Sequence, residues 1–228
     1  MMIRYNLLVN RNYTIGVVIE YIIVKVNKKK KMETIITNIE KLAKVSPYIK
    51  LYKTFGSDVI LRNIGKITGE VDKQHIDFLL NTNGASILDY CFLGMKNRKL
   101  GANVYENIRE LWQADSLLTF RFWGIVGTSC GENFGYLDKL DNSGNHYIGY
   151  YSISEPEHIY FVASSFNIFI NKFLKQIELA LIIDKDAINI DNDWFLNPQK
   201  LIIDDIEIAQ CLQSQKTTEY NLLSKKIR

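Results

Sequence analysis

The sequence has few cysteines and few prolines, and each shortage excludes a class of protein. Its three cysteines, Cys91, Cys130 and Cys211, stand far apart without a CxxC pair, so we expect neither a disulfide framework nor a structural zinc site. Three prolines in 228 residues exclude a proline-rich linker protein. The formal net charge of +3 is too small to indicate nucleic-acid binding.

A long apolar run is also missing. Residues 15–26 form an apolar stretch broken by Glu20, which is too short to cross a bilayer, because a spanning helix takes about 20 apolar residues. No small-residue cleavage site follows this stretch, so a secretory signal is not indicated. Together with unpaired cysteines, which fit a reducing compartment, this predicts a cytoplasmic protein.

Charge divides the chain into three parts. Residues 1–31 carry a net charge of +6, so the rest of the chain carries −3. The lysines at 28–31 stand directly before Met32 and could be a translated ribosome-binding stretch, which makes Met32 an alternative start. The other interpretations of 1–31 are a peripheral strand, a disordered arm or a membrane-surface anchor. We expect a main domain over 32–183 and an acidic, partly helical appendage over 184–228.

Helices are predicted where apolar residues recur at helical spacing. The first runs from Met32 and stops near Pro47. Asp72 is an N-cap candidate, and Asn103 with Glu106 has the spacing of a capping box. The clearest helix follows Ser165, since a single stripe carries its apolar side chains: Phe166, Phe169, Ile170, Phe173, Leu174, Ile177 and Leu181. In the tail, Asn197-Pro198 predicts a helix start, with Ile202, Ile206 and Ala209 on one side.

Between these helices lie aromatic and β-branched segments bounded by Gly, Asn and Ser, which is typical of strands. Short turn clusters at 127–133 and 141–145 favour antiparallel hairpins. The pattern therefore predicts an α+β fold, with a largely antiparallel central sheet of about five to six strands covered by helices. The strand candidates are Ser86–Leu93, Phe120–Val126, Phe134–Leu137, His146–Ser152 and Ile159–Val162.

One motif resembles a catalytic nucleophile. Residues 127–131 read GTSCG and match G-x-S-x-G, with Ser129 in the nucleophile position. Such a serine needs a helix immediately after it, whereas residues 134–137 are predicted to be a strand. A hairpin turn is therefore the preferred interpretation, and a serine hydrolase using Ser129 remains a weaker alternative. We expect no enzyme.

The sequence offers no metal or cofactor site either. His75, His146 and His158 lack the spacing that places two ligands on one face, and His146 and His158 are predicted to be surface histidines. The acidic stretches at 184–186 and 191–193 lack the glycine and the glutamate of a calcium loop, and no phosphate-binding loop is present. We expect no cofactor and no bound metal.

Several short segments, in order, resemble the SUKH superfamily, which includes the Smi/Knr-type yeast regulators. The front half is FLLNTNG at 78–84 followed by Leu93-Gly94. The back half is WGIV at 123–126, FGYLD at 134–138, a turn around Gly144, and ASSF at 163–166 before an aromatic helix. The resemblance covers roughly residues 34–178. The chain departs from the family's pattern at Val71, where a Leu-Pro is usual, and after residue 183.

The resemblance implies a binding protein with an α+β fold. Many bacterial members are immunity proteins, which bind and neutralise a cognate toxin, often a nuclease, inside the producing cell. The resemblance also implies structural roles for the residues of these motifs: Asn83, Gly84, Gly94, Trp123 and Phe166. An alternative function is a Smi/Knr-type regulatory or scaffolding module.

Because the chain is acidic outside its first 31 residues, a basic partner fits it best. Four carboxylates near predicted strand ends are our candidates for binding it: Asp138, Asp141, Glu155 and Glu157. We expect them to steer association with a basic toxin by competing with nucleic acid for its cleft. Neither direct nucleic-acid binding nor membrane binding is expected.

Overall fold

The computed structural model describes residues 31–67, 69, 71–95, 103–215 and 218–220. Residues 1–30 of the predicted N-terminal extension lie outside the described residues, so the extension and the alternative start at Met32 stay predictions. The described part has one seven-stranded sheet in which every neighbouring pair is antiparallel and the spatial order follows the chain order. The strands are β1 (Ile49–Leu51), β2 (Ala85–Ile87), β3 (Tyr90–Phe92), β4 (Phe122–Gly127), β5 (Glu132–Leu140), β6 (His146–Ser152) and β7 (Ile159–Ala163).

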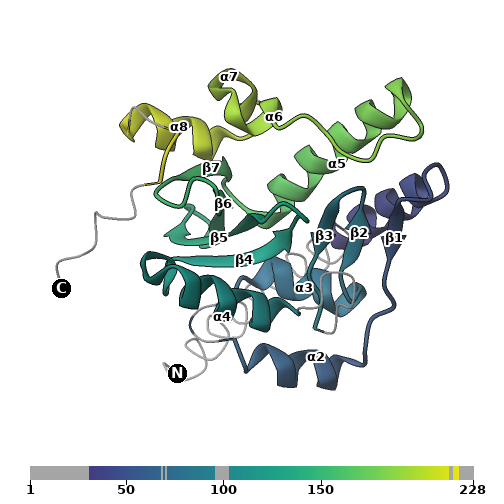
Figure 1. Cartoon of the computed structure of the whole chain (residues 1–228), viewed down its shortest axis with the longest axis horizontal. Coiled ribbons are helices and arrows are strands. Elements are labelled where there is room, and N and C mark those ends of the chain that lie inside the picture. The colour runs from purple at the N-terminus through teal and green to yellow at the C-terminus, as the bar shows by residue number, and fades with distance from the viewer. Residues whose placement is uncertain (1–30, 68, 70, 96–102, 216–217, 221–228) are drawn as a thin grey trace, which may run out of the picture.

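Helices cover this sheet. In Figure 1, α4 lies below β4, while α5 and the helices that follow it lie above β5 to β7. A helix over residues 31–43 precedes β1. The labelled helices are α2 (Ser57–Ile64), α3 (Lys73–Asn81), α4 (Val104–Ala114), α5 (Phe166–Ile183), α6 (Asp193–Leu196), α7 (Pro198–Leu201) and α8 (Ile206–Gln215), with a short 3-10 turn η1 (Ser116–Leu118).

The α+β class and the antiparallel sheet are confirmed, but the predicted count of five to six strands is wrong. The segment predicted as one strand over 86–93 folds back on itself, so that Ile87 pairs with Tyr90. Leu88 makes this reversal with a φ of 55°, a conformation that a leucine adopts only under strain and that its sequence does not announce. β1 also escaped prediction, because three residues are too few to show an alternating pattern.

The predicted helix starts are confirmed where a side chain caps the backbone. Asp72 accepts from the amides of Gln74 and His75, at 2.8 and 3.0 Å. Asn103 and Glu106 form the reciprocal capping box at the start of α4. These caps depend on residues a few positions apart, which is why the sequence revealed them.

Two paired glycines let neighbouring strands and side chains approach closely. Gly135 of β5 stands opposite Gly149 of β6. A Cβ at Gly135 would lie 2.3 Å from the Trp123 carbonyl oxygen, and one at Gly149 would lie 2.8 Å from Ile159 Cγ2. Neither position accommodates a side chain, so neighbouring strands and side chains approach closely there.

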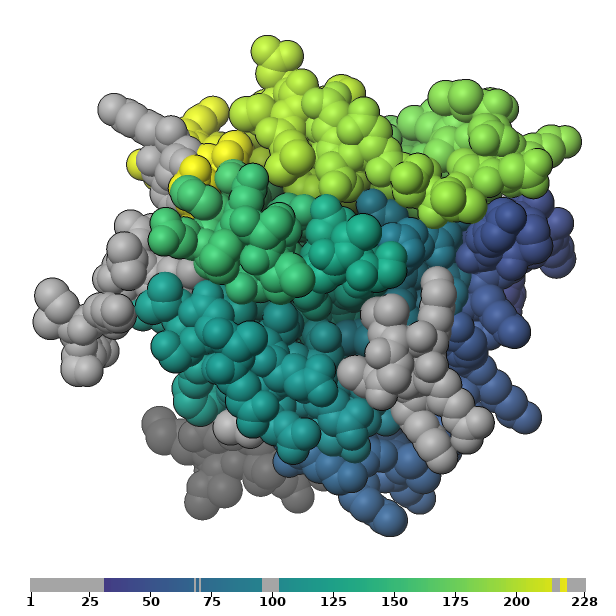
Figure 2. Space-filling model, viewed as in Figure 1, coloured from purple at the N-terminus to yellow at the C-terminus, as the bar shows by residue number. Residues whose placement is uncertain are grey.

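The residues after 183 pack into the same core as the rest of the chain. Trp194 and Phe195 of α6 are buried against Phe134 of β5, with ring centroids 6.5 and 5.3 Å away. In Figure 2 the yellow-green C-terminal segment lies directly against the main body of the molecule. The tail contains the short helices α6 and α7 and the longer α8. The predicted apolar side of one continuous helix is wrong, however. Ile202 and Ile206 are exposed, because α7 ends at Leu201 and α8 begins anew at Ile206.

The motifs that carry the SUKH resemblance occupy structural positions. A Cβ at Gly84, where φ is +82°, would lie 2.2 Å from the Phe92 carbonyl oxygen. Asn83 accepts from the Met95 amide at 2.9 Å, which joins the segment after α3 to the segment after β3. Trp123 stacks on Tyr136 with centroids 5.4 Å apart, and the side chain of Phe166 is buried. These contacts fit the structural roles expected of the motif residues.

Candidate partner-binding surface

The four carboxylates proposed from the sequence fall into two pairs at opposite ends of β6. Asp138 and Asp141 lie at the end of β5 and in the turn before β6, whereas Glu155 and Glu157 lie in the turn after it. β6 has 7 residues, and a strand rises about 3.3 Å per residue, so the pairs are separated by roughly 20 Å along the strand. The structure therefore does not bring the four together.

The first pair is engaged in holding the fold. Asp141 accepts from the amides of Ser143 and Asn145, at 2.8 and 2.7 Å, and shapes the β5–β6 turn. The carboxylate of Asp138 accepts from the Tyr220 hydroxyl, so it binds the tail of this same chain. Asn142 in the same turn donates to both carboxylate oxygens of Glu207 on α8, at 2.8 and 2.7 Å. Helix α8 and the Tyr220 side chain therefore contact this end of the sheet.

The second pair is exposed. Glu155 and Glu157 flank Pro156 in the β6–β7 turn, beside a shallow cavity of about 430 Å³ that His158 and Tyr160 also line. Burial, reinforced by the Glu155 and Glu219 carboxylates, raises the pKa of Tyr160 and keeps its hydroxyl protonated. The pair is thus free to meet a partner, next to a phenol that remains a hydrogen-bond donor.

The tail forms an isolated antiparallel β-bridge, between Tyr160 and Glu219, beside this turn. The Phe161 amide donates to the Thr218 carbonyl at 2.9 Å, and the Tyr220 amide donates to the Ile159 carbonyl at 2.7 Å. Next to them the His158 ring lies 3.2 Å from the Glu219 carboxylate. Residues 218–220 therefore cover the outer edge of β7, which would otherwise be open to another strand.

Ser129, the candidate nucleophile, lies in the turn between β4 and β5. No helix follows it, because β5 begins at Glu132, so the hairpin interpretation is confirmed. Its hydroxyl donates to the Asp89 carboxylate at 3.0 Å to Oδ1 and 3.3 Å to Oδ2. The Asp89 carboxylate orients the Ser129 hydroxyl through these two hydrogen bonds, and neither bond involves a histidine that could act as a base.

The β2–β3, β4–β5 and β6–β7 turns lie at the same end of the sheet. The reason is that β2, β4 and β6 run in the same direction, since β3 and β5 between them are antiparallel to their neighbours. A Cβ at Gly131 would lie 2.3 Å from Ile153 Cδ1, so the β4–β5 turn touches the β6–β7 turn. We call residues 88–89, 128–131 and 153–158 the turn edge. It holds Asp89, Glu155 and Glu157 and contains no lysine or arginine.

The histidines do not form a site. His146 was expected on the surface, but it is buried, with its Nδ1 against the Leu137 carbonyl, because the turn that precedes it docks on α3. His75 is buried between Tyr136 and Phe166, and burial lowers its pKa to about 3. His158 is half exposed, as predicted. Within the described ranges, no cluster of three or more His, Cys, Asp or Glu residues could hold a metal ion.

Sequence reasoning missed the polar network behind the turn at 141–145. The Gln74 amide donates to Asn145 at 2.8 Å and accepts from the Asn167 backbone amide at 2.7 Å. The other carboxylate oxygen of Asp72 accepts from the His146 amide at 3.2 Å. The sequence predicted that Asp72 caps α3, but no local pattern indicated the long-range contacts of Asp72 and Gln74 with residues 145, 146 and 167.

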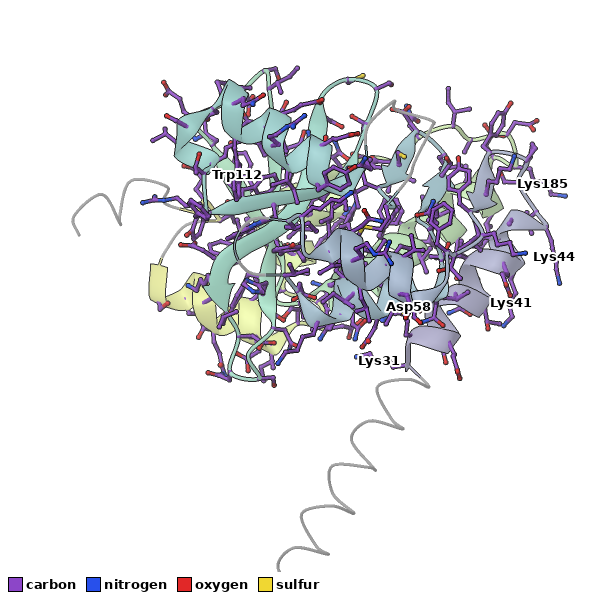
Figure 3. The ribbon with its side chains drawn as sticks, turned by 90° about the horizontal axis from the view of Figure 1, so that it is seen from below. Lys31, Lys41, Lys44, Asp58, Trp112 and Lys185 are labelled. Atoms are coloured by element: carbon purple, nitrogen blue, oxygen red, sulfur yellow. The ribbon has the colours of Figure 1, made fainter. Side chains whose placement is uncertain are left out.

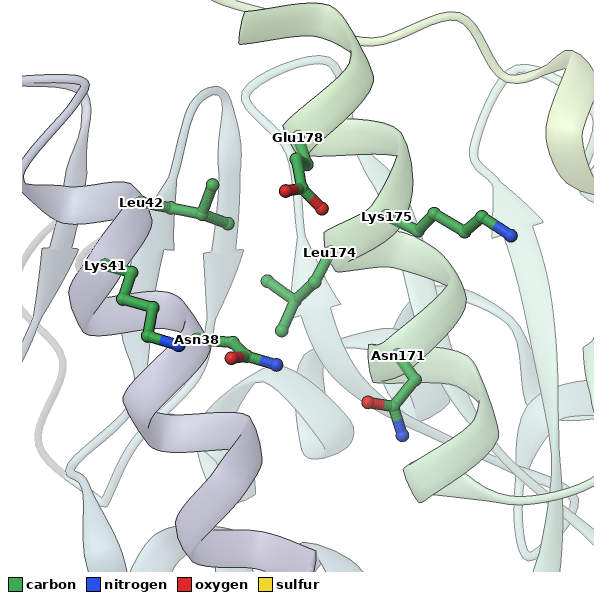
Figure 4. Close-up of a pocket in the computed structure, with 7 residues that line it drawn as sticks. All are labelled: Asn38, Lys41, Leu42, Asn171, Leu174, Lys175 and Glu178. Carbon is green, nitrogen blue, oxygen red and sulfur yellow. The ribbon is translucent and has the colours of Figure 1, made fainter. Parts of the chain in front are cut away.

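A separate groove of about 310 Å³ lies between the helix over 31–43 and α5 (Figure 4). Its charges are mixed: Glu178 points toward the groove, whereas Lys175 points away from it. Figure 3 shows Lys41, Lys44 and Lys185 at this same end of the molecule. The lining residues are Asn38, Lys41, Leu42, Asn171, Leu174, Lys175 and Glu178. This groove lacks the single sign of charge that characterises the turn edge.

Comparison with known proteins assigns no family, because the chain matches no protein-family model and no curated protein. The resemblance to the SUKH superfamily therefore stays a prediction. Among the described helices, none is long and apolar enough to cross a membrane.

Proposed function

We propose that this chain is a SUKH-like, non-enzymatic binding protein, an immunity protein that neutralises a basic protein toxin by direct contact. A nuclease is the toxin class that fits best, and the cytoplasm of the producing cell is the compartment. The observation that carries the proposal is the turn edge, whose three turns hold Asp89, Glu155 and Glu157 and contain no lysine or arginine. The sequence hypothesis thereby narrows from four carboxylates to the Glu155 and Glu157 pair, joined by Asp89.

The turn edge suits a basic partner for electrostatic reasons. Carboxylates along one edge, without lysine or arginine among them, create a negative field that steers a basic protein. Such steering raises association rates by about 10- to 1,000-fold at low salt. Ile153, which is 58% exposed, supplies apolar surface in the midst of these acids. An interface of this kind gains affinity from the apolar contact and selectivity from the charges.

The hydrolase alternative is less well supported. A nucleophilic serine needs a base that removes its proton, and the contact of Ser129 is with the Asp89 carboxylate, an oxygen acceptor that orients the hydroxyl. The hairpin turn also lacks the helix that follows a nucleophile elbow. We therefore assign Ser129 a role in turn geometry.

The test is capture of the partner by the full-length chain carrying an affinity tag, expressed in its native cell, with the retained proteins identified by mass spectrometry. We expect a basic toxin domain, whose lethal activity in cells disappears when this chain is co-expressed. Recovery of signalling or cell-envelope proteins, without protection against a toxin, would instead favour a Smi/Knr-type regulatory module.

Charge-reversal variants make the test specific for the turn edge. The triple variant Asp89→Lys, Glu155→Lys, Glu157→Lys should slow association about tenfold or more and flatten its dependence on salt. The matched control Glu40→Lys, Asp58→Lys, Glu110→Lys makes the same change of charge at exposed positions on three helices. An equal loss in both variants would show that net charge, and not the turn edge, governs binding.

A further inference from the structure

We infer that the cavity beside Asp89 is an anchor pocket for one arginine side chain of the protein partner. This inference rests on the proposed function, because it names the contact that a basic partner would make at the turn edge. The cavity has a volume of about 300 Å³, at the small end of the range for ligand pockets. It is lined by Tyr48, Leu88, Asp89, Ser129, Ile188 and Asn189.

The chemistry of the walls matches the two ends of an arginine. Tyr48, Leu88 and Ile188 are apolar walls for its methylene stem, and the Tyr48 and Ile188 side chains are 46% and 58% exposed. An exposed tyrosine ring also offers a face on which a guanidinium group can stack. At such surfaces a long basic side chain buries its stem and keeps its charge at a polar group.

Asp89 supplies that polar group. Its carboxylate accepts a hydrogen bond from the Ser129 hydroxyl. No cation among the described residues lies within ion-pair distance of this carboxylate. Each carboxylate oxygen has two acceptor positions, so capacity for an N–H donor remains on both. The negative charge is therefore fixed in orientation and uncompensated within the part of the chain that the structure describes.

The backbone holds Asp89 in the wall of this pocket. Leu88, which precedes it, is buried and has a φ of 55°. The Leu88 amide donates to the Tyr48 carbonyl at 3.1 Å, so the turn is tied to another wall of the pocket. A strained and anchored turn keeps its side chain in one place, which lowers the entropic cost of binding.

The pocket can be tested on the full-length chain without knowing the partner. The probes are two capped tripeptides, acetyl-Gly-Arg-Gly-amide and its citrulline counterpart, which has nearly the same shape but no charge. Titration followed by amide chemical shifts should show the arginine peptide binding about three- to fivefold tighter, with shifts at Leu88, Asp89, Ser129 and Asn189. Equal binding of the two peptides, or shifts located elsewhere, would overturn the proposal.

Two neutralising variants separate the pocket from general charge. Asp89→Asn preserves an acceptor for the Ser129 hydroxyl, so the turn should remain folded while the preference for arginine over citrulline disappears. Asp58→Asn removes the same charge from an exposed position on α2, outside the pocket wall, and should leave that preference unchanged. An equal effect of both variants would refute the pocket.

The same variants distinguish failure of the pocket from failure of the proposed function. If the wild-type chain captures a basic toxin and Asp89→Asn captures it with unchanged affinity, the pocket is wrong and the function stands. If the wild-type chain protects against no toxin while the arginine peptide still binds beside Asp89, the pocket stands and the proposed function is wrong.

Discussion

The carboxylate of Asp205 is buried and lies 3.7 Å from the ammonium group of Lys172. It also accepts from the Ser164 amide at 2.8 Å and from the Ile208 amide at 3.2 Å. One side chain of the tail thereby joins the start of α8, the segment before α5 and the middle of α5. Lys172 reinforces the joint by donating to the Leu201 carbonyl at 2.5 Å.

We predict that Asp205→Ala lowers the free energy of unfolding by about 3 kcal/mol, because it leaves a partly buried ammonium group without its counter-charge and two buried amides without their acceptor. Lys172→Met is the matched variant: it removes the charge but keeps both amide contacts, and it should cost less. Urea unfolding at neutral pH measures both values. A smaller loss for Asp205→Ala than for Lys172→Met would contradict this account.

His75 should make the fold sensitive to mild acid. Burial lowers its pKa from 6.5 to about 3, so below pH 6.5 the unfolded chain binds a proton that the folded chain refuses. Stability contributed by the neutral ring is complete above pH 6.5 and is lost as the pH falls toward 3. Between pH 7.5 and 5 the loss should be about 2 kcal/mol.

The variant His75→Leu should flatten this part of the stability profile, since leucine has a similar volume and no proton to bind. Urea unfolding at half-unit pH steps provides the comparison with the wild-type chain. If the slopes of the two proteins between pH 7.5 and 5 were the same, the acid sensitivity would belong to another group.

Two glycines with the same backbone conformation should respond differently to alanine. Gly84 and Gly144 have φ values of +82° and +76°, but only Gly84 is packed: its added Cβ would lie 2.2 Å from the Phe92 carbonyl oxygen, whereas nothing lies within 4 Å of one at Gly144. Gly144→Ala should cost about 1 kcal/mol, the price of the left-handed conformation alone. Gly84→Ala should cost several times that, measured by thermal unfolding.

The β-bridge between the tail and β7 leads to a prediction about hydrogen exchange. A chain that ends at Gln215 lacks the Thr218 carbonyl to which the Phe161 amide donates. Its Phe161 amide should exchange more than tenfold faster than in the full chain. The Leu93 amide, which donates to Ile125 inside the sheet, is the internal control and should keep its protection. Unchanged protection of Phe161 would show that residues 218–220 do not hold the β7 edge closed.

Local features of this fold were legible in the sequence. Asp72, the Asn103–Glu106 box and the Asn197-Pro198 helix start act within four residues, so their pattern alone identifies them. The reversal at Leu88-Asp89 was missed, because leucine is not a turn residue and only its tertiary surroundings hold it at positive φ.

The candidate site depended on contacts that no local pattern records. The sequence proposed Glu155 and Glu157 as partner-binding residues, and for Ser129 it favoured a hairpin turn over a catalytic role. Asp89 was not predicted as a site residue, since its hydrogen bond with Ser129 joins residues 40 positions apart. Likewise His146 read as a surface residue until the docking of its turn on α3 buried it.

The sequence by itself determined the α+β class, the antiparallel order of the main strands and the helices that their caps and apolar stripes define. These follow from hydrogen bonds and spacings within a few residues. The tertiary structure alone decided that Asp138 holds the tail, that Asp141 holds the β5–β6 turn, and that Asp89 contacts Ser129 in the neighbouring β4–β5 turn. A carboxylate's role depends on which distant donors reach it, and that is fixed only when the sheet has formed.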